Sequence, residues 1–504
     1  MLKLAEKNRK WWILLAMSSS LALVFIDQTA LAVALPAIQR ELNLSNSLSQ
    51  WVINAYLLAL SAIILLGGKI GDRLGHKRAF LAGVIVFITA STLAALAESG
   101  AWLITARAIQ GIGAAFMMPS TNALVTNAFP AQERGKALGI YIALATIFLA
   151  LGPLLGGFLT QVFSWRAVFW INFPIALISI ILAISSVPTW RRREKLNIDY
   201  LGFFISVIFI SGFVLGFMEA PNWGWTSLPI MGLFLLSIIS LITFIGWEKK
   251  IPHPLVELTL FKNLTFTTLF SVLLIILAVA IVFVFLAIFL QNVLHYSPLM
   301  AGLLLLPAMV PIMLMAPVGG HLRDKYGPTL PMFCGALLVV LSLIWIAIFS
   351  HNRGYAWLFP GLLVYGIGMP LILSGIMATV MNMVNAQQRG MASAIFNCAR
   401  QFGNTIGLAL LTGLLASVNK WQLNSFLHHS PVPLSRLKEQ QIDGLLVQSD
   451  QAMKAIAHLS LAHIELLKTA ALNAYTNAFS MTLLAAAILA FLSLFLILKI
   501  PRKQ

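Results

Sequence analysis

The chain has 504 residues, of which 60% are hydrophobic and only 10% are charged. Soluble domains contain about 45–50% apolar and about 25% charged residues, so this composition excludes a water-covered globular surface and indicates a protein dissolved in lipid. The net charge of +17 is compatible with nucleic-acid binding in principle. The basic residues, however, form short clusters between apolar runs, which is the pattern that orients membrane spans.

A transmembrane helix needs about 20 mainly apolar residues. We predict fourteen membrane-spanning helices, in chain order at 12–36, 47–67, 79–97, 102–123, 137–160, 167–187, 200–218, 228–247, 264–290, 299–319, 329–349, 356–380, 391–417 and 475–498.

Lysine and arginine are distributed unequally between alternate connections. With the N-terminus in the cytoplasm, the basic clusters fall on the cytoplasmic side, at 3–10, 69–78, 134–136, 191–195, 249–262, 323–325 and 499–503. Cytoplasmic loops carry such an excess, and an even number of spans then puts both termini inside. Segment 418–474 is too long for this rule; we expect an extracytoplasmic helical hairpin there, with an unstructured loop as the alternative.

Two short motifs occur twice in the chain. The sequence at 67–75 has a near copy at 319–327, and the sequence at 131–137 has one at 386–392, with similar offsets. Such a repeat predicts two homologous halves related by an axis along the membrane normal. We therefore predict an all-α polytopic membrane protein with one six-helix bundle in 1–190, an inserted span pair in 191–262, and a second six-helix bundle in 263–504.

The first repeated motif predicts a gating loop at the cytoplasmic side. Its glycines allow two helices to approach closely, and Asp72 can bind a helix N-terminus or a base such as Arg73. A contact of this kind holds one conformation and opens in the other; the alternative is a polar turn without such a role. The residues assigned to the gating loop are Gly68, Asp72, Arg73, Gly75, Arg78 and Asp324.

Asp27 is the only one of sixteen acidic residues that lies deep in a predicted span. A charged carboxylate in lipid costs several kcal/mol, so such a residue is a candidate proton carrier; a structural carboxylate paired with a base is the alternative. Arg107 lies at a similar depth, about 8 Å from the outer edge against about 13 Å for Asp27, so the two residues can pair. The second deep base, Arg400, can meet a carbonyl, an anionic substrate group or a lipid.

The fifth span carries Gly152, Pro153, Gly156 and Gly157. Proline frees a carbonyl and the glycines permit close packing, which predicts a bend. The corresponding span of the second half has Gly407 and no proline, so the asymmetry suggests a functional use. A simple packing kink is the alternative.

These features together resemble the major facilitator superfamily, and specifically its fourteen-span drug:proton antiporter branch. The resemblance rests on motifs in the expected order on the expected spans, at 26–36, 68–78, 107–115, 139–157, 165–174 and 199–202. Ala32 stands where the branch usually has Asn, and Phe148 where it usually has Gly. The resemblance implies proton coupling by Asp27 and Arg107, conformational gating by Asp72 and Arg73, and control of exchange direction by residues 152–157.

Polar side chains on three spans are candidates for lining a central cavity: Gln28, Gln110, Asn397, Arg400, Gln401 and Asn404. Since those of the thirteenth span include no acid, dicationic substrates are less favoured than monocationic, neutral or anionic amphiphiles.

The predicted function is proton-coupled export of hydrophobic or amphiphilic small molecules by alternating access. The alternative within the same fold is a dedicated exporter of one metabolite, siderophore or lipid. Metalloprotease, hydrolase-elbow and ATP-binding motifs are all missing from the sequence, so we expect neither an enzyme nor a metal or cofactor. The expected partners are a small-molecule substrate, protons and the bilayer, and the expected state is a monomer in the bacterial inner membrane, without nucleic acid.

Overall fold

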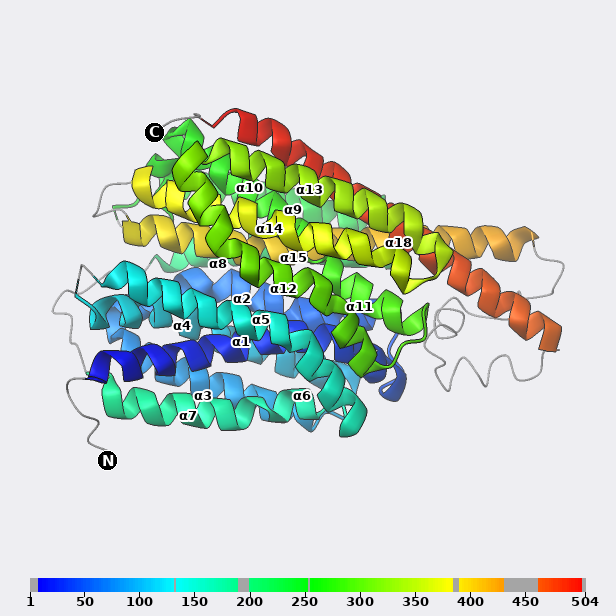
Figure 1. Cartoon of the computed structure of the whole chain (residues 1–504), viewed down its shortest axis with the longest axis horizontal. Coiled ribbons are helices and arrows are strands. Elements are labelled where there is room, and N and C mark those ends of the chain that lie inside the picture. Colours follow the sequence, from blue (N-terminus) through cyan, green and yellow to red (C-terminus); the bar gives the residue numbers. More distant parts are fainter. Residues whose placement is uncertain are drawn as a thin grey trace.

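The computed structural model describes residues 8–130, 133–188, 199–252, 254–383, 389–429 and 461–500. Within these ranges all regular elements are helices, most of them long and aligned with the long axis of the molecule (Figure 1). This follows from the composition, because a helix satisfies its own backbone hydrogen bonds in a solvent that offers none.

The first bundle contains six spans. They are α1 (Arg9–Glu41), α2 (Asn46–Leu74), α3 (His76–Ala95), α4 (Gly100–Ala128), α5 (Arg134–Val162) and the pair α6 (Ala167–Trp170) and α7 (Asn172–Ser186). Helix α1 packs against α4, α5 and α7, and also against α11 of the second bundle. It is therefore the central helix of the first bundle, and 22 of its residues are buried.

The inserted pair consists of α8 (Tyr200–Trp223) and α9 (Leu228–Glu248), followed by the short helix η2 (Leu258–Lys262). Helix α8 contacts α9 on one side and both α2 and α15 on the other. It therefore lies along the line where the two bundles meet, while α9 lies outside it with most of its apolar side chains exposed.

The second bundle also contains six spans. They are the pair α10 (Leu264–Ala280) and α11 (Val282–Asn292), then α12 (Pro298–Tyr326), α13 (Thr329–Phe349), α14 (Tyr355–Met383), α15 (Arg389–His429) and α18 (Leu461–Leu498), with a short turn η3 (Ser350–Asn352) after α13.

The span prediction is confirmed. Within the described residues, 13 helical segments are long and apolar enough to cross a membrane, and α5 contributes a shorter apolar stretch at Ile147–Val162. Helix α1 begins and α18 ends at the same end of the molecule (Figure 1); we call this the termini end and the opposite one the far end.

The internal repeat is visible in the helix ends. Both α2 and α12 have 29 residues. Each begins at a serine whose hydroxyl accepts a hydrogen bond from the backbone, Ser45 and Ser297 respectively. Each ends at a glycine with positive φ, +95° at Gly75 and +80° at Gly327, where a side chain would strain the backbone. The two helices thus occupy equivalent places in the two halves.

One sequence expectation needs correction. The segment expected as a gating loop is helical: α2 continues through Leu74, and Gly75 alone makes the turn into α3, because its positive φ lets the chain reverse in one residue. The expected helical hairpin at 418–474 stays a prediction: its described ends are helical, since 418–429 continues α15 and 461–474 begins α18. The side chains of Gln422 and Asn477 join these two extensions by a 2.9 Å hydrogen bond, and the intervening residues 430–460 lie outside the described part.

Candidate functional site

The carboxylate of Asp27 lies in the middle of α1 and is completely buried. Its Oδ2 accepts a 2.5 Å charged hydrogen bond from Nη1 of Arg107 on α4, which is also completely buried. A buried ion pair is tolerated in lipid only when its remaining polar atoms are also satisfied. Charge neutralisation therefore explains how both groups occupy the core of the first bundle.

Two amides complete the surroundings of the Asp27 carboxylate. Nε2 of Gln110 donates to Oδ1 of Asp27 over 2.9 Å, while Oε1 of Gln110 accepts from Arg107 over 2.6 Å. Nδ2 of Asn172 on α7 lies 3.4 Å from the same Oδ1 and 2.9 Å from Oγ of Ser91 on α3. Helices α1, α3, α4 and α7 thus meet at one polar network.

Arg107 has partners besides Asp27. Its Nε donates to the backbone oxygen of Val52 on α2 over 3.0 Å. Its guanidinium carbon lies 4.4 Å from the ring centre of Tyr56 and 5.8 Å from that of Phe169, distances at which an arginine is attracted to an aromatic face. Because of these contacts, the positive charge of Arg107 keeps some of its stabilising partners when the charge of Asp27 changes.

The glycines of α5 allow helices to approach closely on two sides. A side chain at Gly152 would overlap Thr29 of α1, and one at Gly156 would overlap Ala30, two and three residues after Asp27 in the sequence. A side chain at Gly157 would overlap the backbone of Pro298 at the start of α12. Helix α5 therefore touches the central helix of its own bundle and the opposite bundle, and both contacts depend on the missing Cβ atoms.

Further contacts between the bundles run from the middle to the far end. The hydroxyls of Ser61 on α2 and Thr405 on α15 are 2.6 Å apart. Gln291 of α11 donates to the backbone oxygen of Val33 on α1 over 2.8 Å. Together with the α5–α12 contact, they close the far end of the interface.

The residues assigned to the gating loop lie at the termini end of α2 and the start of α3, apart from Asp324, which belongs to the last turn of α12. Gly68 faces Pro119 of α4, and Asp72 lies 3.3 Å from Nε2 of His76. Arg73 donates to the hydroxyl of Tyr200 on α8 over 3.4 Å, while Arg78 is exposed. The side chain of Asp324 lies outside the described set.

The candidate cavity residues separate into two groups. Gln110 belongs to the Asp27 network, whereas the others lie on α1 and α15. Arg400 stacks on Phe25 of α1 at 5.2 Å, and Nε2 of Gln401 lies 3.4 Å from the sulfur of Met118 on α4. Gln28, Asn397 and Asn404 are partly buried.

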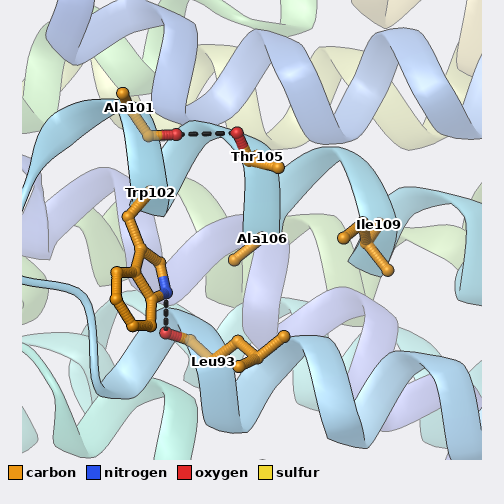
Figure 2. Close-up of a pocket in the computed structure, with 6 residues that line it drawn as sticks. All are labelled: Leu93, Ala101, Trp102, Thr105, Ala106 and Ile109. Atoms are coloured by element: carbon orange, nitrogen blue, oxygen red, sulfur yellow. Dashed lines mark hydrogen bonds between the residues drawn. The ribbon is translucent and has the colours of Figure 1, made fainter.

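A pocket of about 400 Å³ lies elsewhere, between α3 and α4 (Figure 2). Its lining is almost entirely apolar and comes from Leu93, Ala101, Trp102, Thr105, Ala106 and Ile109. The Trp102 indole donates to the backbone oxygen of Leu93 over 2.9 Å (Figure 2). None of the predicted cavity residues contributes to this pocket.

Sequence reasoning missed Tyr56, Ser91 and the positioning role of Asn172. The sequence could have pointed to Asn172, because this residue belongs to the motif at 165–174. No sequence motif marks Tyr56 or Ser91, since each is an isolated residue on a mainly apolar span.

Residues 17–408 match the Major Facilitator Superfamily. The chain is 32% identical to the multidrug resistance protein Stp of Mycobacterium tuberculosis, over 84% of this chain and 79% of that protein. It is 31% identical to the tetracenomycin C resistance and export protein of Streptomyces glaucescens, over 82% of this chain and 77% of that protein.

Among solved structures, the fold is similar to that of a bacterial homologue of the human lysosomal transporter Spinster, with a TM-score of 0.66 and 18% sequence identity over 99% of this chain and 98% of the other. The two repeated bundles, the apolar spans and these matches lead to one assignment: this multi-pass membrane protein belongs to the Major Facilitator Superfamily.

Proposed function

We propose that this protein exports hydrophobic or amphiphilic small molecules in exchange for protons. The names of its relatives support export of toxic compounds: Stp is called a multidrug resistance protein, and the Streptomyces glaucescens relative a resistance and export protein. In this function the exported molecule crosses the membrane chemically unchanged.

The observation that carries proton coupling is the place of Asp27. The other buried carboxylates of the described residues, Asp199 and Glu248, lie at helix ends, whereas Asp27 lies in the middle of the central helix. Protonation neutralises Asp27 and weakens its ion pair with Arg107, which keeps its other partners. Because α1 also contacts α5 and α11, a change in the tie between α1 and α4 reaches the interface between the bundles.

The direction of opening follows from the membrane orientation. We propose that the termini end is cytoplasmic, because basic residues such as Lys10, Lys69, Lys77 and Arg323 lie near the helix ends there. The far end is then extracytoplasmic, and the contacts that close it support an inward-facing state. In this state a substrate enters from the cytoplasm, and separation of α5 from α12 releases it outside.

The alternative is an exporter of one metabolite, siderophore or lipid. Growth in toxic dyes separates the two functions. A multidrug exporter protects cells against several unrelated dyes, whereas a dedicated exporter protects against none.

The test of coupling is transport in vesicles that contain the purified protein. With a pH gradient as the only driving force, the wild type concentrates a fluorescent amphiphile and Asp27→Asn does not. The matched control Glu98→Gln removes an exposed carboxylate and leaves transport unchanged. Substrate counterflow without a gradient persists in Asp27→Asn and shows that the variant is folded. Gradient-driven accumulation by Asp27→Asn at the wild-type rate would contradict the proposal.

A further inference from the structure

The residues of α15 from Arg400 to Thr405 lie against three helices of the first bundle. Arg400 reaches Phe25 of α1, Gln401 reaches Met118 of α4, and Thr405 reaches Ser61 of α2. This segment is therefore at middle depth in the interface between the bundles, where alternating access places a substrate.

Arg400 differs from Arg107 in its electrostatic surroundings. Among the described residues, no carboxylate lies within ion-pairing distance of Arg400, and its Nε is buried without a hydrogen-bond partner. Arginine keeps its proton in proteins, so Arg400 does not escape the cost of an unpaired charge by losing a proton. The residue as a whole is only partly buried, so an acceptor from outside the protein, either water or an anionic group of a ligand, can reach its charge.

The neighbours of Arg400 are suited to an amphiphile with an anionic group. Phe25 covers the guanidinium with an aromatic ring at 5.2 Å, and the phenols of Tyr56 and Tyr141 lie within its electrostatic range. Nearby, Gln28 is the hydrogen-bonding neighbour of the Tyr56 hydroxyl, and Oε1 of Gln401 is buried without a partner. The site thus offers a fixed positive charge, hydrogen-bond donors and aromatic surface together.

We propose that Arg400 is a specificity-determining residue that binds an anionic group, such as a carboxylate, sulfonate or phosphate, on an amphiphilic substrate. The planar guanidinium offers two parallel N–H donors to such a group, and the ring of Phe25 packs against the apolar part of the substrate. This inference rests on the proposed export function for its biological meaning.

Tyr56 connects this site with the proton site. Its ring lies on Arg107, the partner of Asp27, and its phenol lies within electrostatic range of both Asp27 and Arg400. Export of an anion in exchange for protons moves net positive charge into the cell. An interior-negative membrane potential therefore drives transport of an anionic substrate more strongly than that of its neutral or cationic analogue.

The test is equilibrium binding of two dyes that differ in one group. Rhodamine B has a free carboxyl group, and its ethyl ester does not. Purified full-length protein in neutral-lipid nanodiscs binds rhodamine B about tenfold or more tightly than the ester, as expected for a charge-assisted hydrogen bond. Arg400→Gln removes this preference and leaves binding of the ester equal or stronger, whereas Arg400→Lys retains part of the preference.

Arg353→Gln is the matched control, because it removes an exposed arginine, just after the η3 turn, whose side chain binds Asn473 of α18. It keeps the preference for the free acid. An equal affinity of the wild type for acid and ester would overturn the proposal, as would a preference that survives in Arg400→Gln. Retained ester binding shows that Arg400→Gln is folded. No proton gradient is present, so a failure of proton coupling leaves this result intact.

Phosphatidylglycerol distinguishes a lipid headgroup from a soluble amphiphile as the source of the anion. When added to the nanodiscs, it displaces rhodamine B from the wild type if anionic lipids occupy the site. Undiminished binding supports a soluble amphiphile, and both results agree with an anion site at Arg400.

Discussion

The carboxylate of Asp27 and the guanidinium of Arg107 form an ion pair of 2.5 Å in a place that is closed to solvent on all sides. Removing one member of such a pair leaves the other charge buried, which costs about 3–5 kcal/mol. Removing both leaves neutral groups among amides that can bind them. The two residues are therefore expected to be strongly coupled in stability.

A double-mutant cycle measures this coupling. Arg107→Gln lowers the thermal unfolding midpoint more than Asp27→Asn does, because Arg107 keeps Val52, Gln110 and the Tyr56 ring as partners when Asp27 is neutral. The double variant is more stable than Arg107→Gln alone. If the two losses of stability simply add, the ion pair has no energetic role.

The contact between α5 and α12 gives a second prediction. Gly157→Ala places a methyl group on the backbone of Pro298 and separates the far ends of the bundles. Overpacking costs about 1–3 kcal/mol, so we expect transport to fall about tenfold or more. Labelling of a cysteine introduced at Leu299 by a membrane-impermeant reagent increases in parallel.

Gly246→Ala on α9 is the control for this variant, since nothing lies within 4 Å of the added methyl group. It leaves transport unchanged and gains up to about 1 kcal/mol of helix stability. Wild-type transport by Gly157→Ala would show that the α5–α12 approach has no functional importance.

The hydroxyl pair Ser61 and Thr405 allows a crosslink across the interface. Ser61→Cys with Thr405→Cys, in a background without Cys334 and Cys398, forms a disulfide on oxidation, because the two hydroxyl oxygens are only 2.6 Å apart. The crosslink stops transport, and a reducing agent restores it. Loss of maleimide labelling reports the bond, and the single-cysteine variants serve as controls. Full transport by the oxidised protein would show that the bundles do not separate at this level.

The cap of α8 gives a stability prediction. Oδ1 of Asp199 accepts from the backbone of Gly202 over 2.9 Å and from the Trp247 indole over 3.0 Å. Asp199→Ala therefore costs about 1–2 kcal/mol, the usual value for a lost N-cap. Asp199→Asn retains most of the stability, because asparagine is also a capping residue.

Ser227 is the matched control at the start of α9, where it occupies the N-cap position without a side-chain cap bond. Ser227→Ala changes stability by less than about 0.5 kcal/mol. Hydrogen exchange in the first turn of each helix measures both effects. Equal protection of α8 in Asp199→Ala and the wild type would contradict the capping role.

Hydropathy and the internal repeat were sufficient to predict the spans, the two halves and the inserted pair, because lipid allows few alternatives to an apolar helix. Depth along the spans brought Asp27 and Arg107 together as possible partners but left their contact open. The contacts of Tyr56 and Ser91 depend on the rotation of their helices, which no periodic pattern reveals on a span that is apolar all round. The helical end of α2 was not predicted, because its polar and glycine residues are typical of a loop. Only the positive φ of Gly75 shows that the chain reverses at this one residue.

The position of α8 has a consequence for the motion of the whole protein. Toward α2 it is held by directional bonds, from Trp51 to Glu219 over 2.8 Å and from Arg73 to Tyr200. Toward α15 it offers mainly an aromatic surface, with the rings of Phe209 and Phe402 5.6 Å apart, and a single 3.0 Å hydrogen bond runs from Trp225, just after α8, to Ser417. Directional bonds break when helices slide, whereas apolar surfaces can slip over one another. In an alternating-access cycle we therefore expect the inserted pair to move with the first bundle, so that eight spans move together against six.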